Sequence, residues 1–395
     1  MASTPGTQDE EGTLRAMVVP SQGLRLRIAS LFAGAGGLDL GFRGGFSHLG
    51  VFYERLPYET VWAVDIDRDA ELTWRANPNY LPVQAFVRGD IYDQDPDSVP
   101  DFDVLLAGFP CQPFSNAGKR LGLRDPRGTL FEEVERFARA KRPKVVLLEN
   151  VKGILSTKTP EGVPVTEEIR RRLERLGYWV SPPALLRSEE YGVPQRRHRV
   201  FVLALREGLP PFDFGLLRSF VKPESLARRH LREVLKGVSE DLPNAADLWP
   251  FSPSQEAIVR HVKRSWKDVP DELLSERFLK IRRQPERYRS PNFYRRFGLD
   301  EVAGTITASA QPENCGIIHP TEDRRYTVRE AARIQSFPDD FVFAARSVQG
   351  KYKLVGNAVP PVLAWTIARA LQAHLVGEAF ARGRPEDLFG VDIRS

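Results

Sequence analysis

Short, almost wholly apolar segments recur along the first half of the chain and alternate with segments of helical periodicity. The apolar segments are "LRIASLF", "TVWAVDID", "AFVRGDI", "FDVLLAG", "KVVLLENV" and "HRVFVLALR". Helical stretches such as "TLFEEVERFARAKR" and "VTEEIRRRLERLG" separate the later ones. Apolar strands that alternate with helices are typical of a sheet that is buried on both faces and runs mostly parallel. The pattern therefore predicts an α/β fold of the doubly wound kind.

The alternation stops at about residue 207, and this break predicts the domain organisation. Residues 208–303 are rich in Pro, Arg and aromatic side chains, and helical periodicity returns in "YTVREAARIQSF" and "PPVLAWTIARALQAHLV". We therefore expect a small domain inserted into a larger one. The predicted units are a flexible tail over 1–24, a catalytic domain over 25–207 and 304–378, an inserted domain over 208–303, and a C-terminal tail over 379–395.

Composition narrows the class of protein. The 395 residues include only 2 Cys, so a disulfide framework is excluded, and no Cys and His cluster has zinc-ligand spacing. The first residues lack an apolar signal region, and no stretch reads as a membrane span, which predicts a cytoplasmic protein without a metal. The net charge is +5, yet residues 260–296 alone carry +7. That segment is either a solvated face or a surface for a polyanion.

A glycine-rich turn follows the first predicted strand, in "SLFAGAGG". Gly34, Gly36 and Gly37 would let backbone N–H groups at a helix start approach a ligand. Asp39 stands where the dinucleotide fingerprint requires glycine. The turn therefore disfavours a nicotinamide dinucleotide and leaves open a nucleoside cofactor without a pyrophosphate.

Two acidic residues end the next predicted strands at the same edge of the sheet, where open α/β sheets bind ligands. Asp65 could accept hydrogen bonds from both ribose hydroxyls, and Asp90 could accept one from an adenine amino group. The alternative is that both carboxylates cap helices. Apolar walls for the same pocket would come from Phe32, Ile66 and Ile91.

Reactive side chains follow the later strands. Cys111 lies in "GFPCQPFSNAG", where the residues around it predict a partly exposed loop and a reactive thiol. Glu149 follows apolar residues in "LLENV", so a raised pKa and an acid role are expected. Arg197 and Arg199 in "QRRHR" suit bidentate contacts to a phosphate or a base carbonyl, or form a basic surface cluster.

The motifs "FAGAGG", "PCQ", "ENV", "QRRHR" and "GNAVPP" occur in this order, with "RRYTVREAARIQSFP" before the last. Over residues 26–206 and 304–375 the chain resembles the DNA cytosine-5 methyltransferases of the prokaryotic modification type. The resemblance implies the S-adenosylmethionine-dependent methyltransferase fold. It also places a variable target-recognition domain between the two matched regions.

The resemblance implies roles for these residues. Cys111 would add to C6 of a cytosine flipped out of double-stranded DNA, and Glu149 would protonate N3. Arg199 would hold the cytosine O2, with Arg197 on the sugar–phosphate. The implied cofactor-binding residues are Phe32, Ala33, Gly34, Gly36, Gly37, Leu38, Asp65, Ile66, Asp90, Ile91, Leu130, Asn357 and Val359. The expected DNA-binding residues are Gln112, Ser115, Arg197, Thr305, Arg282 and Arg283.

Some features depart from the family pattern. Ile66 stands where the adenine platform is often aromatic, residues 44–59 form an insert without an obvious role, and Cys315 is interpreted as a structural thiol. A transfer RNA methyltransferase would share the chemistry, but its "CFT" tripeptide is not present. A catalytically silent DNA-binding homologue would be expected to lack Cys111 or Glu149. We expect a monomer that acts on nucleoid DNA, with a restriction endonuclease acting separately on the same site.

Overall fold

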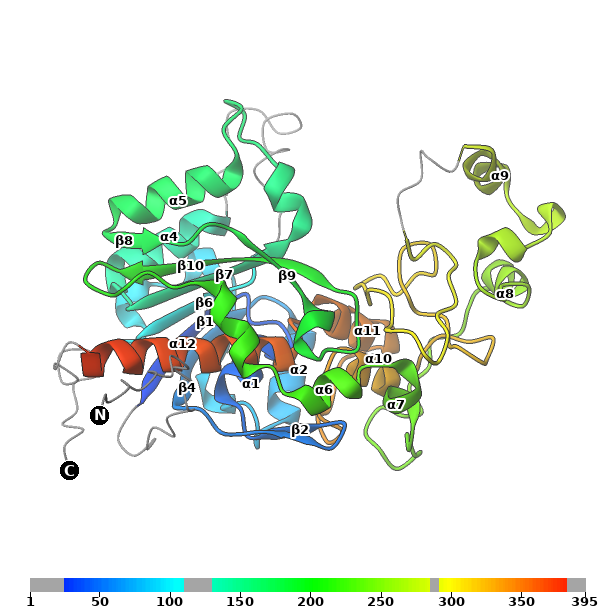
Figure 1. Ribbon diagram of the computed structural model, residues 1–395, viewed down its shortest axis with the longest axis horizontal. Helices are drawn as coiled ribbons and strands as arrows, with labels where there is room; N and C mark the ends of the chain where they lie inside the picture. The colour runs from blue at the N-terminus through cyan, green and yellow to red at the C-terminus, as the bar shows by residue number, and fades with distance from the viewer. Residues whose placement is uncertain (1–24, 110–129, 285–290, 382–395) are drawn as a thin grey trace, which may run out of the picture.

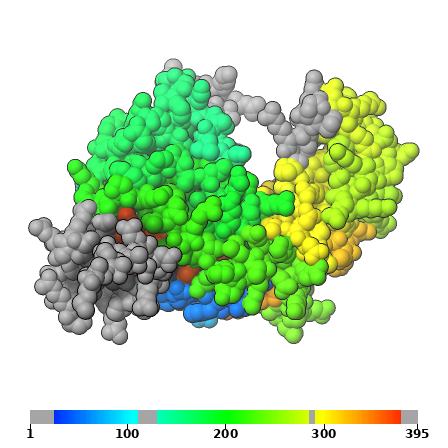
Figure 2. Space-filling model, in the orientation of Figure 1, coloured from blue at the N-terminus to red at the C-terminus, as the bar shows by residue number. Residues whose placement is uncertain are grey.

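The computed structural model describes residues 25–109, 130–284 and 291–381. Figure 1 shows a central sheet with helices on both faces and a second lobe beside it. The space-filling view in Figure 2 shows an open cleft between the two lobes. This arrangement confirms the α/β prediction.

The main sheet has the strand order β5-β4-β1-β6-β7-β10-β8, with β9 paired to β10. Strands β5, β4, β1, β6 and β7 run parallel, whereas β10 is antiparallel to its three neighbours. The sequence pattern did not predict the short strands β8 and β9. The strands are β1 (Leu26–Leu31), β4 (Tyr58–Asp65), β5 (Phe86–Arg88), β6 (Val104–Ala107), β7 (Val145–Val151), β8 (Tyr178–Val180), β9 (Ala184–Arg187) and β10 (His198–Arg206).

Apolar side chains cover both faces of this sheet. Ile28 of β1 packs in the core shared with α1 and α12, whereas Leu31 packs in the core shared with α4 and α5. Because neighbouring strand residues point to opposite faces, a strand buried on both faces reads as a continuous apolar run. The helices on the two faces are α1 (Gly37–Arg43), α2 (Arg68–Ala76), α4 (Leu130–Lys141), α5 (Val165–Arg175) and α12 (Pro361–Ala381).

The stretch Val348–Gly377 is apolar and long enough to pass a membrane-span test, but 89% of its most apolar window is buried inside the protein. It comprises α11 (Val348–Asn357) and most of α12, which lies along the sheet in Figure 1. A core helix has the same composition as a span, so this stretch is explained by packing.

The insert at residues 44–59 forms a hairpin of β2 (Phe46–His48) and β3 (Val51–Tyr53). The ring of Tyr53 packs edge-on against Trp365 of α12, and its hydroxyl bonds the hydroxyl of Ser225. His48 bonds the carbonyl of Arg333 at 2.9 Å. The hairpin therefore packs against the last helix and bonds residues that lie 172 and 285 positions further along the chain, a role that its sequence did not reveal.

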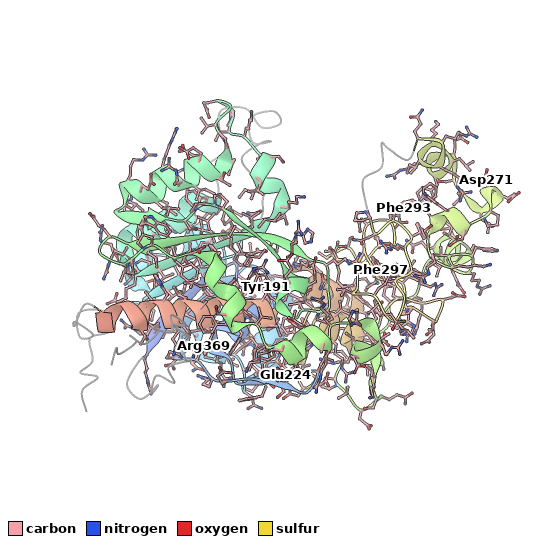
Figure 3. All side chains as sticks on the ribbon, viewed as in Figure 1. Tyr191, Glu224, Asp271, Phe293, Phe297 and Arg369 are labelled. Atoms are coloured by element: carbon pink, nitrogen blue, oxygen red, sulfur yellow. The ribbon has the colours of Figure 1, made fainter. Side chains whose placement is uncertain are left out.

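The predicted insertion at 208–303 is divided between the lobes. Its first part lies against the large lobe, where Leu217 is fully buried and packs in the main core. The second lobe contains α8 (Pro253–Val259), α9 (Glu276–Arg283) and much of residues 291–326 (Figure 1). Figure 3 places Phe293 and Phe297 inside that lobe. The short helices before and after the lobe are α6 (Pro223–Ala227), α7 (Leu231–Leu235) and α10 (Val328–Ile334).

Candidate active site

A cavity of about 870 Å³ opens at the carboxyl ends of the parallel strands. This is the edge at which open α/β sheets bind ligands. Most residues predicted for the cofactor and the catalytic acid meet there. The predicted residues that line it are Phe32, Ala33, Gly34, Gly37, Leu38, Asp65, Ile66, Asp90, Ile91, Leu130, Glu149, Arg197, Arg199, Asn357 and Val359.

The three predicted glycines of the turn between β1 and α1 have different reasons for being glycine. Gly34 has a φ of +53° and open space where a side chain would begin. At Gly36, with φ of +77°, a Cβ would meet the Leu81 side chain, and this residue does not line the cavity. At Gly37 a Cβ would lie 2.2 Å from the carbonyl oxygen of Val359. Gly34 therefore faces the ligand space, whereas Gly36 and Gly37 allow close packing behind it.

Asp65 braces the glycine turn. Its two carboxylate oxygens accept hydrogen bonds from the backbone N–H groups of Gly34 and Asp67, both at 2.8 Å. Burial raises the pKa of Asp65, and these two backbone hydrogen bonds oppose the rise. Asp67, not Asp65, caps α2. The capping alternative is therefore wrong for Asp65.

Asp90 and Ile66 also line the cavity. The Asp90 side chain accepts from the N–H of Tyr92 at 3.2 Å and caps a short 3₁₀ helix, as the capping alternative expected. Ile66 is 66% exposed, which is unusual for isoleucine and leaves an apolar surface open to the cavity. An apolar ring placed there would cover it.

Glu149 and Arg199 form a buried ion pair at the inner wall. The Arg199 Nε atom lies 3.0 Å from Glu149 Oε1. The two side chains meet because β10 runs antiparallel to β7, with Arg199 opposite Val151. Burial raises the pKa of Glu149, and the charges of Arg199 and Arg197 partly offset this effect. A carboxyl group with a raised pKa can hold a proton and donate it.

Arg197 is only 1% exposed and is held by backbone carbonyls. It donates to the carbonyl oxygens of Ile306 at 3.1 Å and Asn357 at 3.3 Å. Its Nε has no hydrogen-bond partner among the described residues. The side chain therefore braces the cavity, and its predicted contact with a sugar–phosphate stays a prediction.

Cys111, Gln112 and Ser115 lie outside the described residues. The chain leads toward them from Phe109, which lines the cavity just after β6. Asn150 donates from Nδ2 to the Phe109 carbonyl at 2.9 Å and accepts from the Val151 N–H at 2.8 Å. This hydrogen bond joins Phe109, which follows β6, to the end of β7. Asn150 was not predicted as a site residue. The signal for it was the polar amide that directly follows Glu149 at the end of an apolar strand in "LLENV".

Thr305 and Cys315 both bond backbone groups of neighbouring segments. Thr305 donates from its hydroxyl to the Arg196 carbonyl at 2.6 Å, which joins the "GTIT" turn (residues 304–307) to "QRRHR" (residues 195–199). Cys315 is fully buried, its sulfur accepts from the Thr307 N–H at 3.2 Å, and burial raises its pKa to about 11. Its interpretation as a structural thiol is confirmed.

The basic side chains of segment 260–296 are of two kinds: some bond groups inside the second lobe, and others are exposed. Arg282 donates to the carbonyls of Trp266 and Val269, both at 2.7 Å, and forms an ion pair with Asp271. Arg296 is buried and donates to several carbonyls of the second lobe. Arg283 is exposed. The expected phosphate contact of Arg282 therefore competes with the bonds that its guanidinium makes inside the second lobe, and it stays a prediction.

The fold and the site define an α/β protein of the methyltransferase fold, with a cavity of about 870 Å³ at the strand ends, a buried acid at its wall and a second lobe across a cleft. Residues 26–373 match the family of C-5 cytosine-specific DNA methylases, and the chain belongs to this family. It is therefore a DNA (cytosine-5-)-methyltransferase. Within the described residues, no group of three or more His, Cys, Asp or Glu side chains could hold a metal ion.

Bacterial modification enzymes are similar along most of the chain. Type II methyltransferase M.Eco47II of Escherichia coli is 34% identical over 88% of this chain and 79% of its own length. Type II methyltransferase M.NgoFVII of Neisseria gonorrhoeae is 34% identical over 85% and 83%. The structure of the S. pombe Dnmt2 methyltransferase shares the fold, with a TM-score of 0.61, 19% identity and coverage of 88% and 99%.

Proposed function

We propose that the protein transfers a methyl group from S-adenosylmethionine to C5 of a flipped-out cytosine in a specific sequence of double-stranded DNA. The Glu149–Arg199 ion pair in the wall of the 870 Å³ cavity carries the proposal. We further propose that it acts as a cytoplasmic monomer in a restriction–modification system, with the endonuclease as a separate protein.

The residues of the cavity fit the cofactor by their chemistry. Asp65 offers carboxylate oxygens for ribose hydroxyls, and Ile66 and Ile91 offer apolar surface for adenine. Gly34 leaves open space for the methionine portion, next to Asn357 and Val359. When bound, S-adenosylmethionine supplies an electrophilic sulfonium methyl group.

The protein's own residues activate the base. Cytosine C5 is a weak nucleophile, so the Cys111 thiolate adds to C6, and the C5–C6 pair of electrons becomes available at C5. Glu149 holds a proton at N3, which accepts the electron density pushed into the ring. After methylation, a solvent water takes the C5 proton, the electrons of the C5–H bond re-form the C5–C6 double bond, and the C6–S bond breaks to release Cys111 as thiolate. Arg199 keeps the carboxyl group oriented and faces the cytosine O2.

Bisulfite sequencing of DNA from cells that express the chain tests the proposal. We expect one short sequence to carry 5-methylcytosine, and a Cys111→Ser variant to produce none. Duplexes containing that sequence with 5-fluorocytosine should form a denaturation-resistant adduct with the wild type. Absence of any DNA methylation would support the silent homologue, and methylation confined to RNA would support the transfer RNA enzyme.

A further inference from the structure

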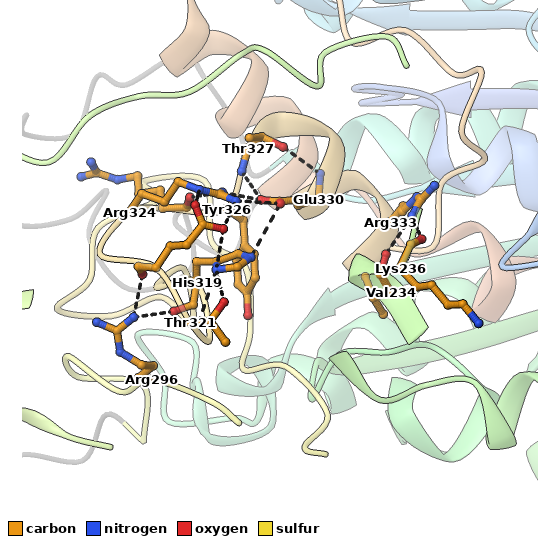
Figure 4. Close-up of polar contacts among 12 residues, drawn as sticks. Val234, Lys236, Arg296, His319, Thr321, Arg324, Tyr326, Thr327, Glu330 and Arg333 are labelled. Carbon is orange, nitrogen blue, oxygen red and sulfur yellow. Dashed lines mark hydrogen bonds and ion pairs between the residues drawn. The ribbon is translucent and has the colours of Figure 1, made fainter. Parts of the chain in front are cut away.

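Helix α10 lies beside α11, between the second lobe and the large lobe (Figure 1). Its first turn is closed by a capping box between Thr327 and Glu330. Glu330 also pairs with Arg324 at 2.7 Å and lies 3.8 Å from His319. Figure 4 shows that Arg296 of the second lobe joins the same cluster, and it donates to the His319 carbonyl at 2.7 Å. The first end of α10 is therefore fastened to the second lobe.

The other end of α10 is fastened to the cavity wall by two fully buried amides, Gln335 and Gln195. Gln335 donates from Nε2 to the carbonyl of Ala358, between Asn357 and Val359. Its Oε1 accepts from the Nε2 of Gln195. Gln195 in turn accepts from the N–H of Ile306 at 2.9 Å, next to Thr305. The chain of amides thus runs from the "GTIT" turn to the cofactor wall.

The backbones along this route are in close contact. A Cβ on Gly356 would lie 2.3 Å from the backbone of Thr307, and one on Gly37 would lie 2.2 Å from the carbonyl of Val359. Cores packed this tightly do not deform freely, so a shift of the turn at 304–307 must be passed to residues 356–359. Arg197 makes a parallel connection from Ile306 to Asn357.

We infer that Gln195 and Gln335 are positioning residues that couple DNA binding at the 304–307 turn to cofactor binding at the 357–359 wall. Each buried amide has one orientation that satisfies all its hydrogen-bond partners. A ligand that holds the 304–307 turn in the position required by this orientation therefore also favours the matching position of residues 357–359, and the reverse holds as well. Such coupling is reciprocal: the cofactor raises the affinity for DNA by the same factor by which DNA raises the affinity for the cofactor. The inference rests on the proposed function.

The test uses S-adenosylhomocysteine, which cannot donate a methyl group, and the duplex whose sequence bisulfite sequencing identifies. Duplex affinity is measured by fluorescence anisotropy with and without saturating S-adenosylhomocysteine. The coupling factor is the affinity with S-adenosylhomocysteine divided by the affinity without it. We expect this factor to be at least about five for the wild type. In Gln335→Met this factor should fall below about twofold, and Gln195→Met should show the same loss. Because the factor is a ratio, a general loss of affinity does not change it.

Gln372→Met is the matched control, since Gln372 is a buried glutamine on α12 that does not belong to the route. It should keep the wild-type factor. Thermal melting of each variant establishes that it folds, and either Gln335→Met or Gln195→Met alone is sufficient for the test. A wild-type factor of one, or an unchanged factor in the folded variants, overturns the inference. Failure of the wild type to bind either ligand would instead refute the proposed function.

Discussion

The exposed basic face of α9 should set part of the salt dependence of DNA binding. Arg277, Lys280 and Arg283 recur every third residue on this helix and are all exposed. Arg282 points the other way, with its guanidinium over the Trp266 ring. The informative perturbation is therefore Lys280→Gln together with Arg283→Gln, because both side chains can reach phosphates without disturbing the lobe.

The size of the effect follows from counterion release. Each phosphate contact contributes roughly −0.9 to the slope of log affinity against log salt, so losing two contacts should flatten the slope by about 1.8. When salt rises from about 50 to about 200 mM, both proteins should lose affinity for DNA. The fold-loss should be about ten times smaller for the double variant than for the wild type. Target and non-target duplexes should respond alike, since phosphate contacts carry no sequence information.

Binding isotherms at four salt concentrations measure the slopes. Arg282→Gln is the control: it leaves the carbonyls of Trp266 and Val269 without donors and should lower stability by about 1–3 kcal/mol. Its salt slope should match the wild type. An unchanged slope in the double variant, or a flattened one in Arg282→Gln, would refute this division of the basic residues.

Three further outcomes are expected from buried carboxyl groups. Asp65→Asn should weaken S-adenosylmethionine binding roughly tenfold or more in calorimetry, and unchanged affinity would reduce Asp65 to a brace for Gly34. Because burial raises the pKa of Glu149, the wild-type turnover should fall as pH rises through that raised value, whereas Glu149→Gln should be slow and lack this step. Burial raises the pKa of Asp39 from 3.8 to about 6, so the folded state binds the extra proton between these values and the unfolding free energy falls as pH rises. Urea titrations should show about 3 kcal/mol of this decline in the wild type and not in Asp39→Asn.

The local sequence determined the main architecture and most of the cavity. Strands buried on both faces appear as apolar runs, and their carboxyl ends meet at one edge, so the pattern of residues by itself places Gly34, Asp65 and Glu149 together. The motifs supplied the chemistry expected at that edge. Periodicity and turn residues are local properties, and these predictions needed nothing more.

Tertiary structure alone decided how the long polar side chains are used. Arg282 and Arg283 are neighbours in sequence, yet one holds carbonyls of the second lobe and the other is exposed. Gln195 and Gln335 meet although 140 residues separate them. A buried guanidinium or amide is satisfied by carbonyls that the fold brings to it from distant segments. The sequence shows which side chains can donate hydrogen bonds, and only the folded chain determines which carbonyl accepts them.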